Sequence, residues 1–311
     1  MRRFLCLRSL LLHLPSQLIY NNLMKQSSAK ILLATVFMAR GTSFLFSKNL
    51  LTSMPPMSIL ATRFILAFII LCLVFFKKIR EYTKQTFVCG LLLGLLYTIC
   101  MTFEMYGLRL IDSGVSSLIE NMAILLVPLY VSILTKTLPK IKTIICALLA
   151  LVGVAFLSLT QVLSSKGGLG IILMICAALT YAACILFTEK AAQKGDPITI
   201  GIFQLGTMGF LSLLISLVTN NFAMPSGQTQ WILILVLAVF CSCFGFTFQP
   251  LGQKYLPAES AAVLTVINPL TASLMGILIA HENLTPLKLA GYIIILATLF
   301  FYNSRFLNQK N

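Results

Sequence analysis

The chain has 311 residues, of which 59% are hydrophobic and only 10% are charged, whereas an ordinary soluble domain carries about 25% charged residues. So few charged side chains cannot cover a water-exposed surface, which excludes a soluble globular protein. The high apolar content excludes a disordered chain, because disordered segments are low in hydrophobic residues. The net charge of +15 does not indicate nucleic-acid binding, because the basic residues stand between apolar runs rather than on one face.

Ten apolar stretches are long enough to cross a lipid bilayer as helices, since such a span needs about 20 apolar residues. We expect them at 31–50, 56–76, 87–107, 114–134, 143–161, 168–188, 198–219, 231–253, 258–280 and 286–302. The preceding residues, 1–29, are not counted as a span, and the sequence leaves open whether Met1 or Met24 is the start. The predicted fold class is an all-α membrane protein with ten transmembrane helices.

The distribution of Lys and Arg predicts the orientation, because short cytoplasmic loops of membrane proteins are enriched in these residues. Most of them lie in the N-terminal segment, in the loops after the second and fourth spans, and in the tail 305–311. These segments all fall on the same side of the membrane. We therefore expect a multi-pass protein of the cell membrane with both termini in the cytoplasm.

The two halves of the chain match each other when one is shifted along the other. At a shift of 141 residues Pro56 falls on Pro197, and at a shift of 145 residues Glu104 falls on Gln249. The match predicts two repeats, at 30–162 and 163–304, with five spans each. An odd number of spans makes the second repeat enter the membrane from the opposite side, which is the inverted arrangement typical of secondary transporters.

Several short motifs resemble the EamA branch of the drug/metabolite transporter superfamily. They are Gly41-Thr-Ser-Phe-Leu-Phe-Ser-Lys48, Pro56 with Ala61-Thr-Arg63-Phe64, Gly107-Leu with Ser113-Gly-Val-Ser-Ser, Val127-Pro128-Leu129, Gly252-Gln253-Lys254, Asn268-Pro269-Leu270, and Glu282 with Gly291. The resemblance covers about residues 30–303. It implies two inverted five-helix EamA repeats, a central cavity lined mainly by helices 1, 3, 4, 6, 8 and 9, and export or exchange of small metabolites.

Arg40 departs from that family pattern, in which an aromatic residue often precedes the glycine of helix 1. It lies near the centre of the first span, and its equivalent in the second repeat is Tyr181. One interpretation is a cation in the cavity that binds a substrate carboxylate or phosphate, because guanidinium binds planar anions bidentately. The other is a structural salt bridge with Glu104 or Glu120. The sequence leaves both open.

Glu104 and Glu120 lie in the outer parts of the third and fourth spans. A carboxyl group inside the membrane can bind and release a proton, which would make transport proton-coupled. Pairing with Arg40 or Arg63 is the alternative. We expect Arg63, near the outer end of the second span, to extend toward the membrane interface.

Three further polar residues complete the predicted substrate site: Asn121, Gln249 and Asn268, in spans 4, 8 and 9. They either bind substrate or form hydrogen bonds between neighbouring helices. The predicted substrate-binding residues are therefore Arg40, Glu104, Glu120, Asn121, Tyr181, Gln249 and Asn268.

These features favour a secondary transporter that exports small metabolites, such as amino acids or related carboxylates, by alternating access between the repeats. A multidrug exporter of the same family and a non-transporting membrane protein are the alternatives. The sequence has no GxxxxGK[ST], HExxH or GxSxG motif, so we expect neither an ATPase nor an enzyme. We expect no cofactor, metal or nucleic acid. The expected partners are the lipid bilayer, a small-molecule substrate and, if transport is coupled, protons; a homodimer is left open.

Overall fold

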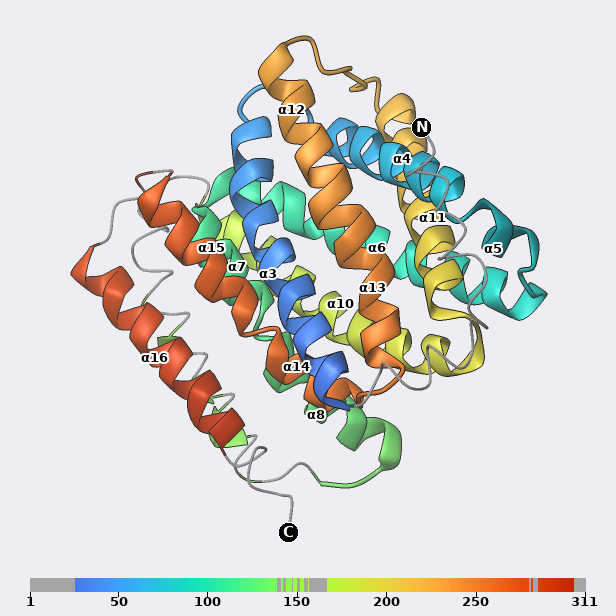
Figure 1. Ribbon diagram of the computed structural model, residues 1–311. Helices are drawn as coiled ribbons and strands as arrows, with labels where there is room; N and C mark the ends of the chain where they lie inside the picture. Colours follow the sequence, from blue (N-terminus) through green and yellow to red (C-terminus); the bar gives the residue numbers. More distant parts are fainter. Residues whose placement is uncertain are drawn as a thin grey trace, which may run out of the picture.

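The computed structural model describes residues 26–138, 167–279 and 285–304, with isolated positions between 141 and 156 and at 281. Within these residues every regular element is a helix, and Figure 1 shows the helices crossing one another in a single bundle. In chain order they are α3 (Gln26–Leu50), α4 (Pro56–Val74), α5 (Phe76–Arg80), α6 (Lys84–Leu110), α7 (Ser113–Glu120), α8 (Ala123–Thr135), α10 (Gly167–Lys194), α11 (Pro197–Val218), α12 (Gln228–Val236), the π-helix η1 (Leu237–Phe244), α13 (Gly245–Gln253), α14 (Ala258–Leu264), α15 (Ile267–Leu278) and α16 (Pro286–Ser304).

Eight of the expected spans are confirmed as helices, or runs of consecutive helices, that are long and apolar enough to cross a membrane. They are Ser28–Leu50, Pro56–Val74, Lys84–Leu110, Ser113–Thr135, Gly167–Lys194, Pro197–Val218, Gln228–Gln253 and Ala258–Leu278. The expected span 143–161 and the segments 1–25 and 305–311 lie wholly or mostly outside the described residues. The last expected span corresponds to α16, whose apolar part, Leu289–Thr298, is shorter. The count of ten therefore stays a prediction.

Two spans are interrupted near their centres, and in each case the sequence supplies a reason. The span of α14 and α15 breaks at Thr265, because Pro269 has no N–H to bond the Thr265 carbonyl and its ring clashes with that group. The span of α7 and α8 breaks after Glu120, where Asn121 Nδ2 donates to the Ser117 carbonyl at 2.7 Å. The backbone at the breaks is still bonded, since the Thr265 carbonyl accepts from the Asn268 N–H at 2.9 Å.

Helices at equivalent positions in the two halves pack antiparallel to each other. α4 and α11 begin at the matched prolines, and Ser58 Oγ lies 3.1 Å from Ser216 Oγ while Gly209 packs against Ile65. The residue number therefore rises along one helix as it falls along the other. Equivalent helices also have equivalent neighbours. α3 packs on α13 and α15, and its equivalent α10 packs on α6 and α8. A local two-fold axis between inverted repeats produces this pattern.

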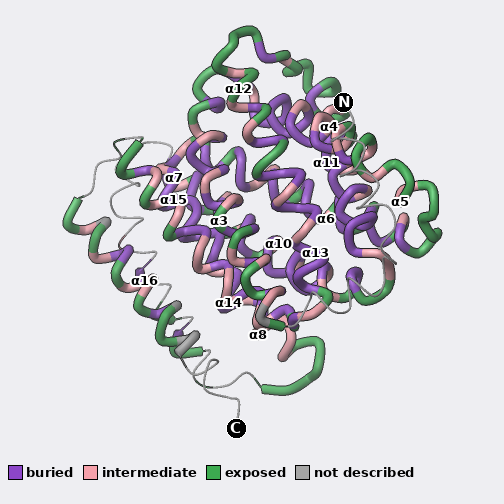
Figure 2. The backbone as a smooth tube through the Cα atoms, in the orientation of Figure 1, coloured by how far each residue is buried: buried purple, intermediate pink, exposed green. Residues whose placement is uncertain are grey.

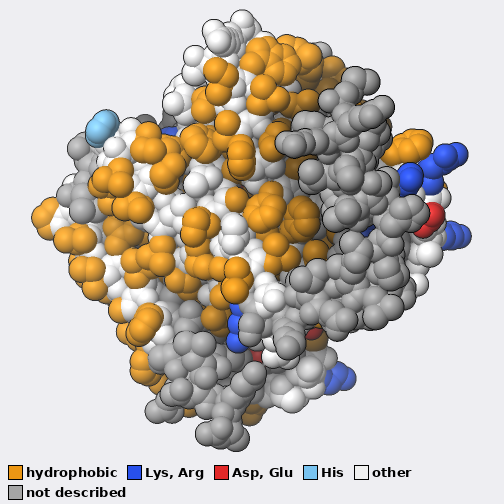
Figure 3. Space-filling model, in the orientation of Figure 1, with side chains coloured by type: hydrophobic (Ala, Val, Ile, Leu, Met, Phe, Trp, Pro, Cys, Tyr) orange, Lys and Arg blue, Asp and Glu red, His pale blue; other side chains and the backbone are white. Residues whose placement is uncertain are grey.

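The buried residues concentrate along α3, α6, α7 and α10, and the exposed ones at helix ends and on outward faces (Figure 2). The outward faces are apolar: Leu73 is 75% exposed and Phe210 64%. Figure 3 shows one such face, largely hydrophobic, with Lys and Arg side chains near its margins. Because apolar surface of this extent is unfavourable in water, these faces contact lipid.

Candidate functional site

Arg40 is held at the centre of the bundle by groups from two other spans. Its side chain is only 5% exposed. Nη1 donates to the hydroxyl oxygen of Tyr181 on α10 at 3.1 Å and to Oε1 of Gln249 on α13 at 2.8 Å. Tyr181 is the repeat equivalent of Arg40, and two equivalent residues can touch only near the axis that relates the halves. The site therefore lies between the two repeats.

Three aromatic rings surround the guanidinium group. Its central carbon lies 4.7 Å from the ring centroid of Phe246, 4.8 Å from that of Tyr181 and 5.8 Å from that of Tyr97. The rings also contact one another, with the centroids of Tyr97 and Phe246 5.3 Å apart in an edge-to-face arrangement. The negative faces of aromatic rings attract a cation, so they hold the charge in place without neutralising it.

The structure does not form the salt bridge that was the alternative interpretation of Arg40. Within the described residues no carboxylate oxygen lies within 4.0 Å of its nitrogens, and its hydrogen-bond acceptors, Tyr181 and Gln249, are both neutral. A buried cation that no carboxylate contacts directly is costly, which makes Arg40 a candidate for binding an anion.

Glu104, near the end of α6, and Glu120, the last residue of α7, are 2% and 1% exposed. The helices that carry them, α6 and α7, pack against each other. Cys100 Sγ lies 3.9 Å from Glu120 Oε1. Within the described residues neither carboxyl group forms an ion pair with an arginine. Two buried carboxyl groups of this kind are candidates for proton binding.

The expectation that Arg63 extends to the membrane interface is wrong. Its side chain is 1% exposed, because it points inward to η1, where Nε donates to Ser242 Oγ at 2.6 Å. The guanidinium also lies over the Phe64 ring, 5.0 Å from its centroid. Nη1 has no hydrogen-bond partner in the described part of the chain. A second buried arginine thus leaves donor capacity unused.

Asn121 and Asn268 bind each other. Asn268 Nδ2 donates to Asn121 Oδ1 at 3.2 Å, linking the two interrupted spans at their breaks. Gln249 continues the polar chain from Arg40, since its Nε2 donates to Oε1 of Gln253 at 3.1 Å. Of the predicted residues, the structure thus brings together Arg40, Tyr181 and Gln249, and separately Asn121 with Asn268. Glu104 and Glu120 are buried on the neighbouring helices α6 and α7.

The sequence interpretation missed Tyr97 and Phe246 as parts of the site and Arg63 as a buried cation. The sequence could have identified Tyr97, because it precedes Glu104 by seven residues and so lies on the same face of the helix. The sequence could not have identified Phe246 in this way, since Phe246 follows a π-helix that shifts the helical register.

The cluster around Arg40 is enclosed by its own side chains, and Tyr181 and Gln249 are 0% and 1% exposed. A cavity of 380 Å³ lies at the end of the bundle where α3 meets α4, and Tyr106 and Arg109 contribute to its wall. The structure is therefore closed over the guanidinium group, so a substrate could reach Arg40 only after the helices move.

Comparison with known proteins agrees with this architecture. The model of the EamA-like transporter family matches residues 27–159 and 168–304. An uncharacterized transporter of Archaeoglobus fulgidus is 31% identical over 55% of this chain, and the match spans 61% of that relative's length. A second one from the same organism is 25% identical over 90% of this chain and 87% of its own. The uncharacterized transporter YvbV of Bacillus subtilis is 25% identical, covering 90% of this chain and 93% of YvbV.

A crystal structure superposes on 92% of this chain and all of its own with a TM-score of 0.68 and 15% identity, which shows a shared fold alone. The two matched regions of the family model each cover one half of the chain, as the internal repeat requires. By its two EamA repeats, its apolar spans and these relatives, the chain belongs to the EamA-like transporter family and is a multi-pass membrane transporter of the drug/metabolite type.

Proposed function

We propose that this transporter exports small metabolites that carry a carboxylate, such as amino acids, and that Arg40 binds the carboxylate. The observation that carries the proposal is the environment of Arg40: among the described residues, neutral hydrogen-bond acceptors and aromatic rings are the groups that contact its charge. A substrate anion would provide the missing counter-charge, and the planar guanidinium could bind both of its oxygens.

The location of Arg40 suits alternating access. It lies between the inverted repeats and touches its own repeat equivalent, Tyr181, so a rocking motion of one half against the other would open it first to one side and then to the other. We place both termini in the cytoplasm and the protein in the cell membrane. Accessibility of tags fused to each terminus tests that orientation, which would be refuted by tags reactive from outside intact cells.

The carboxyl pair of Glu104 and Glu120 supports proton coupling as part of the same proposal. The two groups are buried on the spans next to Arg40, and in this proposal they share one proton. Arrival of a substrate carboxylate would change the balance of charge around that proton. Release of the proton to one side and its uptake from the other would then link substrate movement to a proton gradient.

The multidrug alternative is less compatible with this site. Aromatic rings such as Tyr97 and Phe246 suit amphipathic compounds, but many of those are cations, which Arg40 would repel at close range. An anionic or zwitterionic substrate meets both the rings and the charge.

The test is uptake into proteoliposomes that contain the purified protein. A panel of labelled amino acids and other small carboxylates is compared with the corresponding amides and methyl esters as competitors. We expect saturable uptake that carboxylates inhibit and the neutral analogues do not. Equal inhibition by acids and their amides would overturn carboxylate recognition, and absence of saturable flux for every compound would overturn transport of this substrate class. Arg109→Gln, which removes an exposed arginine, serves as the matched control for Arg40→Gln.

A further inference from the structure

A second pocket lies far along the bundle from Arg40, between the start of α6 and the end of α10. It has a volume of 560 Å³, within the range of about 300–1,000 Å³ usual for small-ligand sites. Its rim carries three lysines, Lys84, Lys190 and Lys194, and its apolar wall includes Val88, Leu92 and Phe187. None of the described residues that line it is acidic. We call this pocket the lysine groove.

The helical periodicity of the two helices creates the lysine groove. Lys84, Val88 and Leu92 follow one another at intervals of four residues along α6, so they form one stripe. Lys190 and Lys194 are spaced in the same way on α10. Since α6 begins where α10 ends, the charged ends of both stripes meet at the same end of the bundle. The apolar parts of both stripes extend from there into the membrane region.

The apolar side of the groove opens to lipid. Val88 is 41% exposed and Leu92 49%, although both lie within an apolar span, Lys84–Leu110. Exposed apolar side chains at this position contact acyl chains in a bilayer. An occupant of the groove would therefore have an apolar part beside Val88 and Leu92 and an anionic part beside the lysines.

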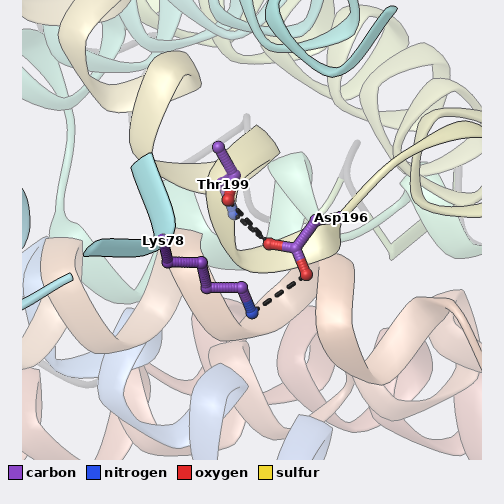
Figure 4. A network of polar contacts seen from close by, with 3 residues as sticks. All are labelled: Lys78, Asp196 and Thr199. Atoms are coloured by element: carbon purple, nitrogen blue, oxygen red, sulfur yellow. Dashed lines mark hydrogen bonds and ion pairs between the residues drawn. The ribbon is translucent and has the colours of Figure 1, made fainter. Parts of the chain in front are cut away.

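The three lysines have no counter-ion among the residues that the structure describes. Within the described residues none of them forms an ion pair or a hydrogen bond. The carboxylate of Asp196, just after the end of α10, is used elsewhere. Its Oδ1 lies 2.9 Å from Lys78 Nζ, and its Oδ2 accepts from the backbone N–H of Thr199 at 2.9 Å (Figure 4). This contact caps the start of α11 and neutralises Lys78 instead.

Lys84 also stands in the first turn of α6, next to the positive end of the helix dipole, where a cation is unfavourable and an anion is favourable. The repulsion among three close cations and this dipole would be relieved by a single bound anion. Together, the apolar wall open to lipid and the unpaired positive rim define the chemistry of the occupant.

We propose that the lysine groove binds an anionic phospholipid, with the phosphate-containing headgroup between Lys84, Lys190 and Lys194 and an acyl chain along Val88 and Leu92. Basic pockets between transmembrane helices at the membrane surface recognise such headgroups. The lipid would bridge α6 and α10, which belong to different repeats and pack closely on each other, and so would stabilise their contact. This binding is separate from the substrate site at Arg40.

The test measures thermal stability and lipid binding of the purified full chain in nanodiscs of phosphatidylcholine with and without phosphatidylglycerol. We expect phosphatidylglycerol to raise the unfolding temperature and to remain bound in native mass spectrometry. The triple variant Lys84→Gln, Lys190→Gln, Lys194→Gln should lower the affinity about fivefold for each lysine, or about 100-fold in all. The variant with arginine at the three positions should retain binding.

The matched control removes three basic residues outside the groove, in Lys77→Gln, Arg80→Gln, Lys254→Gln. This control should bind the lipid with the same affinity as the parent. If it lost as much affinity as the groove variant, the loss would be explained by overall charge, and the proposed site would be overturned. Glycerophosphate and inorganic phosphate are the soluble probes. Stabilisation by these to the same degree would overturn lipid recognition in favour of a free anion, and equal stabilisation by phosphatidylcholine alone would overturn the requirement for an anionic headgroup.

Discussion

Arg40→Met separates a substrate-binding role of this residue from a structural one. Methionine keeps much of the length and apolar volume of arginine but removes the charge. The variant loses hydrogen bonds of 3.1 Å and 2.8 Å and the contacts with the rings of Tyr181 and Phe246. The question is how far the removal of a buried charge offsets these losses.

The magnitudes nearly cancel. Two hydrogen bonds between membrane helices contribute about 2 kcal/mol together, and two cation–π contacts contribute about 2 kcal/mol more. Against this loss of about 4 kcal/mol stands the cost of keeping an arginine in the membrane interior, about 3 kcal/mol on insertion scales. The expected net destabilisation is about 1 kcal/mol, whereas breaking a buried ion pair costs about 3–5 kcal/mol.

The assay combines thermal unfolding in detergent with uptake into proteoliposomes. We expect the unfolding temperature of Arg40→Met to fall by only a few degrees while uptake of the carboxylate substrate is lost. Tyr181→Phe is the matched variant, because it keeps the ring beside the guanidinium and removes one hydrogen bond; it should transport with a raised KM. Uptake by Arg40→Met at the parental rate would refute the binding role. A large loss of stability would show that Arg40 is primarily structural.

Three further perturbations test other parts of the structure. Glu104→Gln retains a hydrogen-bonding partner for Glu120 but cannot release a proton, so uptake driven by an imposed pH gradient should be lost while counterflow of labelled substrate persists. Gly41→Ala should destabilise by about 1–3 kcal/mol in thermal unfolding, because its Cβ would lie 2.7 Å from the Asn268 carbonyl oxygen. Asn268→Ala and Asn121→Ala should show a coupling free energy of about 0.6–2 kcal/mol in a double-mutant cycle, since their side chains bond at 3.2 Å.

Gly41→Ala has a matched control variant, and each of the three perturbations has a result that would refute it. Gly168→Ala is the counterpart of Gly41→Ala, because nothing lies within 4 Å of the added Cβ, and equal destabilisation by both would refute the packing argument. If uptake driven by a pH gradient persisted in Glu104→Gln, this carboxyl group would have no role in proton coupling. Additive effects of the two asparagine substitutions would mean that the bond contributes nothing to stability.

The sequence by itself determined the class of the protein and the outline of its fold. The length of the apolar runs fixed eight described spans, because backbone groups in lipid must be bonded within the helix. The matched prolines at 56 and 197 indicated the repeat, and the odd number of spans in each half predicted that equivalent helices run in opposite directions, as α4 and α11 do. Both properties are local or periodic, so they can be read along the chain.

Only the tertiary structure decided which polar groups meet. The sequence could not distinguish a partner of Arg40 among Glu104, Glu120, Tyr181 and Gln249, because all four are polar residues within apolar spans and stand on different helices. The rotation of each helix about its axis selects the neighbours, and that rotation is set by packing and by the π-helix before Gln249. For the same reason Arg63 faces Ser242 rather than the membrane surface.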